Sequence, residues 1–331
     1  MNHLLRHRFT LIAPLCLMLM LAACKPPSPG IWKDGKISSW NRSKFHDMNK
    51  EALGYLKANK LKSIKSMLSK ELIDETYTER QVELISNRLT DDEYVPLAEY
   101  YVVNRFKDAD TVPATGENIN RYGLQYPGTA PEMYFAFFEP KKSDNKYLIS
   151  LIYAKLDYGW RITELDVSPY TINGKTGPEL YQLGKSQYAK KHLIAALNTL
   201  ALAVTCIKPS EIWQYPDADS LHSLYADVVD EANEKYKFPL ILHDVPTGPM
   251  IVRVYNLKST EGTFPEVYYM THINISDTTA VKKENLLVQK SLSKLMPGID
   301  ENVRYVLYSA YNKRPSGSEE IDHFDMTEKL R

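Results

Sequence analysis

The sequence predicts an α+β protein, on three observations made in order along the chain. Apolar residues first recur at spacings of three and four, between about residues 43 and 89, which is the period of an amphipathic helix. Runs rich in Tyr and Val, separated by turn residues, follow up to about residue 167 and indicate antiparallel strands. The last part mixes strands with one amphipathic helix. We therefore expect helices followed by a curved antiparallel sheet, a helical hairpin as a spacer and a small C-terminal α+β domain.

The first residues have the order of a secretory signal. Residues 6–8 are basic, and an uncharged, Leu-rich run extends from Leu11 to Ala23. This run is shorter than the roughly 20 apolar residues that a membrane-spanning helix needs. The string Leu21-Ala22-Ala23-Cys24 resembles the processing box of bacterial lipoproteins. That resemblance implies cleavage before Cys24, a diacylglyceryl group on its sulfur and often an N-acyl chain. An ordinary secretory signal with an incidental cysteine is the alternative.

The resemblance also implies where the protein resides. Acyl chains such as palmitate contribute about 0.8 kcal/mol per buried methylene, so several chains on Cys24 give stable anchorage in a membrane. Lys25 follows the cysteine where an acidic residue would favour retention in the inner membrane. By the common sorting rule, we expect a lipid-anchored cell-envelope protein at the outer membrane, facing the periplasm.

A proline-rich stretch follows the cysteine. Pro26, Pro27 and Pro29 favour an extended, hydrated chain, so residues 24–43 are expected to act as a tether. Two alternatives exist for Trp32 and Trp40, which can dock either on the folded protein or on lipid headgroups.

Charge and cysteine content exclude some classes of function. The 331-residue chain has 41 Lys and Arg and 41 Asp and Glu, and residues 1–23 remove Arg6 and Arg8 but no acidic residue, leaving 39 basic residues. No basic run suited to a phosphate backbone exists, so no nucleic-acid partner is expected.

Once Cys16 leaves with the signal and Cys24 is acylated, Cys206 is the one cysteine that remains free. We expect it to be a small buried side chain, with no disulfide.

The first folded domain is expected over residues 44–172. Helical spacing covers residues 43–68 and 78–89, and strands are predicted at 93–106, 133–138, 147–154 and 160–167. The meander ends in the string Tyr158-Gly159-Trp160-Arg161-Ile162-Thr163-Glu164-Leu165. This order of helices and then a meander, over residues 44–170, resembles the nuclear transport factor two-like superfamily.

That resemblance implies a cone-like domain whose sheet folds over the helices. Such cones can hold a ligand or an active site, and they also serve as non-catalytic modules. If the cone is open, the candidates for lining its pocket are aromatic side chains: Tyr100, Tyr134, Phe137, Tyr153 or Trp160.

Residues 173–237 are expected to form the helical spacer. Predicted helices cover 179–191, 193–207 and about 220–236, and the second of these is apolar nearly all round, so it should be buried on most sides. Gly184, Ala196 and Ala203, with Pro209 just beyond, make residues 179–209 resemble a single tetratricopeptide-type hairpin. These small residues would let the two helices approach closely. Because one such unit cannot bury its own faces and no second copy follows, we expect an antiparallel hairpin packed between two domains.

Residues 238–331 are expected to form the small α+β domain. Strands are predicted at 240–243, 250–255, 267–273, 302–311 and 324–329, and a helix at 279–295, before Pro297-Gly298.

A search for chemistry finds no catalytic, cofactor or metal motif with the required spacing. Ser143-Asp144-Asn145, Lys175-Thr176-Gly177 and Ser291-x-x-Lys294 resemble fragments of serine penicillin-binding enzymes, but that family places the nucleophile motif first. No two histidines of the mature chain lie three to five residues apart, so no helical zinc pair is expected. Glu164 and Asp166 share one face of a strand, either as paired acids or, more commonly, as a solvent face.

Two hypotheses of different classes follow. The first is a lipid-anchored, non-catalytic envelope module that binds or assembles with an unidentified envelope protein. The second is an enzyme or small-ligand-binding protein that uses the aromatic pocket of the cone-like domain. A pocket with an acid or histidine at its base favours the second, and a domain filled by its own side chains argues against it.

Overall fold

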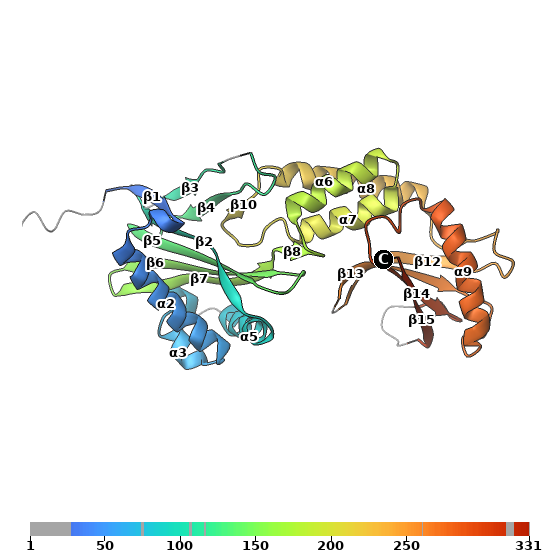
Figure 1. Cartoon of the computed structure of the whole chain (residues 1–331), viewed down its shortest axis with the longest axis horizontal. Coiled ribbons are helices and arrows are strands. Elements are labelled where there is room, and N and C mark those ends of the chain that lie inside the picture. Colours follow the sequence, from blue (N-terminus) through green and yellow to red (C-terminus); the bar gives the residue numbers. More distant parts are fainter. Residues whose placement is uncertain are drawn as a thin grey trace, which may run out of the picture.

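The computed structural model describes residues 28–73, 76–105, 108–115, 117–259, 261–315 and 321–330. The described chain is elongated, with an N-terminal domain (residues 30–176) and a C-terminal domain (237–330) at opposite ends (Figure 1). Helices within residues 177–236 lie between them, and we call this part the helical segment. The predicted α+β class is confirmed, because helices and open, mainly antiparallel sheets alternate in the expected order. Among the described residues, no helix is long and apolar enough to cross a membrane.

An antiparallel five-stranded sheet forms the centre of the N-terminal domain. Its strands, in spatial order, are β1 (Gly30–Lys33), β2 (Tyr94–Val103), β5 (Glu132–Pro140), β6 (Tyr147–Leu156) and β7 (Gly159–Pro169). These segments are rich in aromatic and β-branched residues, which pack well on a pleated surface. β5 and β6 are buried on both faces, so their sequences read as apolar runs and not as an apolar–polar alternation.

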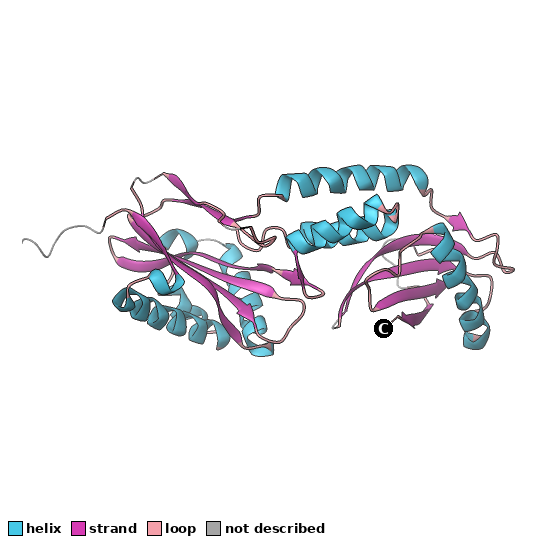
Figure 2. Ribbon diagram, turned by 45° about the horizontal axis from the view of Figure 1, so that its top comes forward, coloured by secondary structure: helices cyan, strands magenta, loops and turns pink. Residues whose placement is uncertain are grey.

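Helices cover one face of this sheet (Figure 2). They are α2 (Ser39–Lys57), α3 (Leu61–Lys65), α4 (Lys70–Ile73) and α5 (Thr76–Asp91). The predicted periodicity is confirmed on α2, where Phe45, Ala52 and Leu56 are buried against the sheet. Ser38 begins this helix, because its hydroxyl accepts a hydrogen bond from the Asn41 N–H at 3.4 Å.

A second, smaller sheet covers the opposite face. It consists of β3 (Ala109–Val112), β4 (Gly123–Pro127) and β10 (Trp213–Gln214), which comes from the middle of the helical segment. Trp213 is only 1% exposed, and its ring stacks on Tyr122 with centroids 3.5 Å apart and meets Phe137 edge-on at 5.1 Å. These strands are short and partly polar, and the sequence patterns did not predict them.

The helical segment contains α6 (Gly177–Ala189), α7 (Leu193–Thr205) and α8 (Ala218–Lys235). Thr176 and Glu179 form a capping box at the start of α6, each side chain bonding the other's backbone N–H. A β-carbon at Gly184 would lie 2.6 Å from Leu200 Cδ2, so glycine permits the close approach of α6 and α7 that the sequence predicts. The strands β8 (Thr171–Ile172) and β9 (Lys175–Thr176) form a hairpin just before α6.

The C-terminal domain is a five-stranded mixed sheet with one helix on it. The strands are β11 (Leu240–Ile241), β12 (Met250–Ser259), β13 (Gly262–Met270), β14 (Tyr305–Tyr311) and β15 (His323–Lys329), in that spatial order. α9 (Thr278–Leu295) connects β13 to β14, which run parallel, and it packs Val281, Val288 and Leu292 on one face of the sheet. This agrees with the predicted small α+β layer.

Two domain boundaries differ from the sequence-based expectation. Residues 30–43 are not part of a tether, because β1 pairs with β2 and a 3₁₀ turn (Asp34–Lys36) leads directly into α2. Four strand residues are too few to show a periodic pattern. The helical segment is also more than a spacer, because one continuous hydrophobic core joins Phe137 of β5, Leu200 of α7 and Val288 of α9. The signal and Cys24 lie outside the described residues.

Candidate functional site

The five aromatic side chains predicted to line one pocket lie on two opposite faces of the N-terminal sheet. Tyr134, Tyr153 and Trp160 pack on the helices, whereas Tyr100 and Phe137 belong to the core on the other side. Neighbouring residues of one strand point to opposite faces, which is why these positions separate. The five candidates therefore cannot all line one pocket.

The space between helices and sheet is filled. The Phe45 ring stacks on Tyr134 with centroids 4.1 Å apart, and the Tyr134 and Tyr153 rings lie 5.7 Å apart. Trp160 meets Phe45 edge-on at 5.1 Å. In the part of the chain that the structure describes, none of the three cavities discussed below is lined by any of these side chains. Their rings pack on one another in the space where the aromatic pocket was expected.

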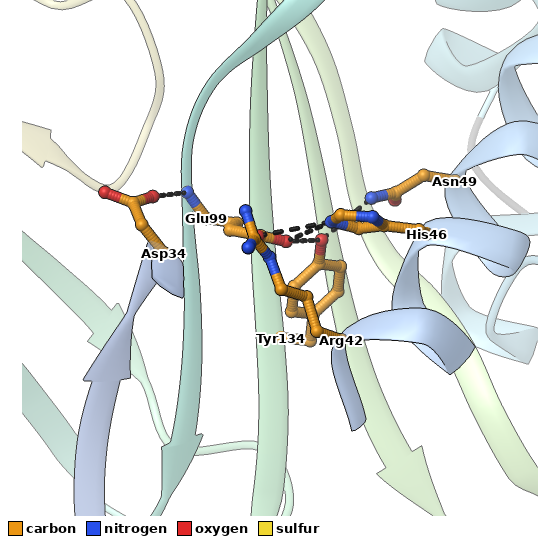
Figure 3. Close-up of polar contacts among 6 residues, drawn as sticks. All are labelled: Asp34, Arg42, His46, Asn49, Glu99 and Tyr134. Atoms are coloured by element: carbon orange, nitrogen blue, oxygen red, sulfur yellow. Dashed lines mark hydrogen bonds and ion pairs between the residues drawn. The ribbon is translucent and has the colours of Figure 1, made fainter. Parts of the chain in front are cut away.

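A buried polar network lies where α2 crosses β2 (Figure 3). Glu99 of β2 accepts hydrogen bonds from Arg42 Nε at 2.6 Å, from Tyr134 Oη at 2.8 Å and from His46 Nε2 at 3.0 Å. Asn49 Nδ2 donates to Tyr134 Oη at 2.8 Å, and the Glu99 N–H donates to Asp34 at 2.9 Å. The Glu99 side chain is 6% exposed, whereas those of Arg42 and His46 are 42% and 46% exposed.

This network attaches α2 to the sheet by satisfying a buried carboxylate. Burial, and then the charge of Glu99, raise the pKa of the Tyr134 hydroxyl, so Tyr134 acts as a donor to Glu99. A histidine oriented by a carboxylate resembles the arrangement of a general base. His46 is not among the residues that line the cavities described below, and we assign the network a structural role.

The two acids predicted to share one face of β7 are withdrawn from water. Asp166 is buried and Glu164 is half-buried, so the prediction of a simple solvent face is wrong. Burial raises the pKa of Glu164 to about 7, with further contributions from the charges of Asp166 and Glu211. Glu164 Oε1 is buried and finds no hydrogen-bond partner among the described residues. Glu164 therefore keeps its proton in the folded state at pH values below about 7.

A cavity of about 900 Å³ lies between the N-terminal and C-terminal domains, and we call it the interdomain cleft. Its volume lies within the range of about 300–1,000 Å³ that is typical of ligand sites. Side chains of both charges and several hydroxyl and amide groups line it: Arg88, Asp91, Asp92, Lys142, Ser143, Asp144, Asn145, Tyr147, Lys258, Ser259, Glu261 and Arg304.

Tyr147 is held between two cations inside the cleft. The Arg88 guanidinium lies 3.8 Å from the ring centroid, and Lys258 Nζ lies 4.9 Å from it. Lys258 Nζ also donates a hydrogen bond to the Tyr147 hydroxyl at 2.6 Å. Because Arg88 and Tyr147 belong to the N-terminal domain and Lys258 to the C-terminal domain, this group joins the two walls.

The walls of the cleft are fixed by hydrogen bonds to backbone groups. Asp92 accepts from the N–H groups of Lys142 and Ser143, both at 3.1 Å, which holds the hairpin between β5 and β6. Asn173 donates to the Thr263 carbonyl at 2.7 Å and accepts from the Thr263 N–H at 2.8 Å, which ties the turn before α6 to β13. Among the described residues, Lys142 and Asp91 form no ion pair, so both charges are free for a ligand.

A smaller and more apolar cavity adjoins the cleft. A cavity of about 270 Å³ shares Asn145, Tyr147 and Lys258 with the cleft. Ile172 and Leu202 also line it. A third cavity, of about 290 Å³, lies between α6, α7 and β13 and includes Lys175 and Arg304. The charged cleft therefore continues into smaller cavities, of which the one that includes Ile172 and Leu202 is the more apolar.

One of the three enzyme-like fragments lines this cleft. Ser143-Asp144-Asn145 lies in the turn between β5 and β6 and lines the cleft, whereas Lys175 of the second fragment lines the third cavity, together with Asp144. The Ser291 hydroxyl instead bonds to Asp244 in the C-terminal domain. Ser291, which would occupy the position of the nucleophile, is therefore not among the described residues that line the cleft. The described residues also contain no group of three or more His, Cys, Asp or Glu side chains placed to hold a metal ion.

Sequence reasoning did not single out Tyr147, Arg88 or Lys258. These residues lie about 60 to 170 positions apart, and no local spacing links them. Only the packing of the two domains on the helical segment brings them together. Cys206, in contrast, is buried as predicted, and burial raises the pKa of its thiol to about 12, which keeps it protonated.

Comparison with known proteins gave no matching family model, no similar curated protein and no similar solved structure.

Proposed function

We propose that this protein is a lipid-anchored component of the bacterial cell envelope that binds a partner protein through the interdomain cleft, without catalysing a reaction. The processing box at Leu21–Cys24 supports the anchorage. The interdomain cleft supports the binding role, and it is the single observation on which that role depends.

The composition of the cleft selects the kind of partner. Four basic and four acidic side chains line it, beside Ser, Asn and Tyr residues. A polyanion such as nucleic acid would leave the four acidic side chains unmatched, and an apolar fatty chain would match none of the eight charges. A polar polypeptide segment that carries charges of both signs satisfies them, because interface charges select partners by complementarity. The occupant that we propose is such a segment of another envelope protein.

Site-specific photo-crosslinking in intact cells tests this proposal. A benzophenone amino acid placed at Lys142 or at Ser259 lies in the cleft, and one placed at Glu234, exposed on α8, is the matched control. We expect a discrete adduct from the two cleft positions and none from Glu234. Reversing Arg88 and Lys258 together, each to Glu, should reduce the adduct at least about tenfold, because like charges across an interface cost several kcal/mol.

Two outcomes would count against a partner in the cleft. One is an adduct of equal yield from Glu234. The other is an adduct at Lys142 and Ser259 that the double charge reversal leaves unchanged while the variant remains folded.

A further inference from the structure

Trp40 has the largest exposed fraction of any large apolar side chain in the described part of the protein, at 74%. Trp32, in contrast, stacks on Tyr101 with ring centroids 5.5 Å apart. The sequence left open whether these tryptophans dock on the folded protein or on lipid headgroups. Trp32 docks on the folded protein, whereas Trp40 is exposed. An indole ring has an apolar body and one N–H group, and it is favoured at a boundary between water and an apolar phase.

The surroundings of Trp40 are basic. Residues 30–50 contain five Lys or Arg residues and two Asp residues. Lys44 follows Trp40 by one helical turn on α2, and its Nζ lies 5.8 Å from the Trp40 ring centroid. Lys36 is exposed in the turn just before α2. We call Lys36, Trp40 and Lys44 the Trp40 surface. Its chemistry, an aromatic ring with amines beside it, complements anionic headgroups over an apolar layer.

The chain that precedes this surface limits its distance from the proposed anchor. Gly30, the first residue of β1, follows Cys24 by only six positions. Even a fully extended segment of that length spans only about 20 Å, at roughly 3.5 Å per residue. β1 and the start of α2 lie at the end of the molecule farthest from the C-terminal domain (Figure 1). An anchor at Cys24 therefore holds this end of the protein against the membrane.

We propose that the Trp40 surface docks on the membrane that holds the acyl chains, with the Trp40 ring among the headgroups and Lys36 and Lys44 against anionic lipids. The inference rests on the proposed anchorage at Cys24 and adds an orientation to it. The protein then stands on its N-terminal domain, and the C-terminal domain points away from the bilayer.

Vesicle binding of the unlipidated protein tests this contact separately from the anchor. The probe is the mature chain with Cys24→Ala, mixed with vesicles of phosphatidylethanolamine and phosphatidylglycerol or of phosphatidylcholine alone. We expect co-sedimentation with the anionic vesicles that weakens with added salt, and quenching of Trp40 fluorescence by brominated lipid. Lys44→Glu should lower the partition coefficient at least about fivefold, because each basic residue near an anionic surface contributes about that factor. Trp40→Ala should lower it as well and remove the quenching.

The control is Leu286→Ala, which removes a similarly exposed apolar side chain (64%) from α9 at the opposite end of the molecule. It should bind vesicles as the parent does, and all variants should keep the parent's thermal unfolding. Equal partition of the parent and Trp40→Ala would overturn the proposal, as would an equal loss with Leu286→Ala. Because this protein carries no lipid, either result leaves the separate test of acylation at Cys24 intact.

Discussion

Replacing Trp213 by alanine is expected to lower the free energy of unfolding by about 3–5 kcal/mol, the range for removing a large buried aromatic side chain. The ring is 1% exposed and contacts the Tyr122, Phe137, Tyr170 and Tyr215 rings. It belongs to β10, which attaches the helical segment to the N-terminal domain. Its loss should therefore weaken the contact between these parts as well as the local core.

Urea denaturation measures this change, and Trp40→Ala is the matched control. Trp40 is exposed, so its replacement should change the free energy of unfolding by no more than about 0.5 kcal/mol. Limited proteolysis of the Trp213→Ala variant should show new cleavage near residues 207–215. A loss below about 1 kcal/mol, similar to that of the control, would mean that Trp213 does not hold the two parts together.

The stability of the protein should fall as the pH rises from about 4.5 to about 7, because of Glu164. Burial raises the pKa of this carboxyl from its ordinary 4.5 to about 7 in the folded state. In that interval the unfolded chain ionises while the folded chain keeps its proton. The stability that Glu164 contributes below pH 4.5 is therefore lost as the pH passes through 7. At about 1.4 kcal/mol per pH unit, the loss reaches at most about 3 kcal/mol for this half-buried group.

Glu164→Gln removes the ionisation and keeps the shape of the side chain. We expect the variant to unfold at higher urea concentration than the parent at pH 8 and at the same concentration at pH 4. Burial raises the pKa of Asp166 too, so part of the pH dependence should remain in the variant. Glu83→Gln, at an exposed position of α5, should leave the parent's pH profile unchanged. A Glu164→Gln variant that follows the parent at every pH would contradict the burial of a protonated Glu164.

The parts of the fold that the sequence predicted are those with strong local periodicity. Phe45, Ala52 and Leu56 recur at helical spacing and are buried on one face of α2. The same is true of Val281, Val288 and Leu292 on α9. The close approach at Gly184 was predictable because small residues occur at the matching turns of two adjacent helices.

Other features depend on contacts between distant segments, and local patterns could not show them. Glu99 is an acid within an apolar strand, and its partners Arg42 and His46 come from α2, more than 50 residues earlier in the chain. β10 is two residues long, and the burial of Trp213 depends on Tyr122, Phe137 and Tyr170, which come from three distant segments. The interdomain cleft likewise forms only when three parts of the chain pack together. The predicted aromatic pocket failed because the position of a residue in a strand decides its face, and aromatic character alone does not.

Metabolic labelling with radioactive palmitate, followed by separation of membrane and soluble fractions, tests the central proposal most directly. It compares the full-length protein with its Cys24→Ala variant in a bacterial host. We expect label and membrane association for the parent chain, and neither label nor cleavage before residue 24 for the variant. Equal labelling of the two proteins, or recovery of the parent unmodified in the soluble fraction, would contradict a lipid anchor at Cys24.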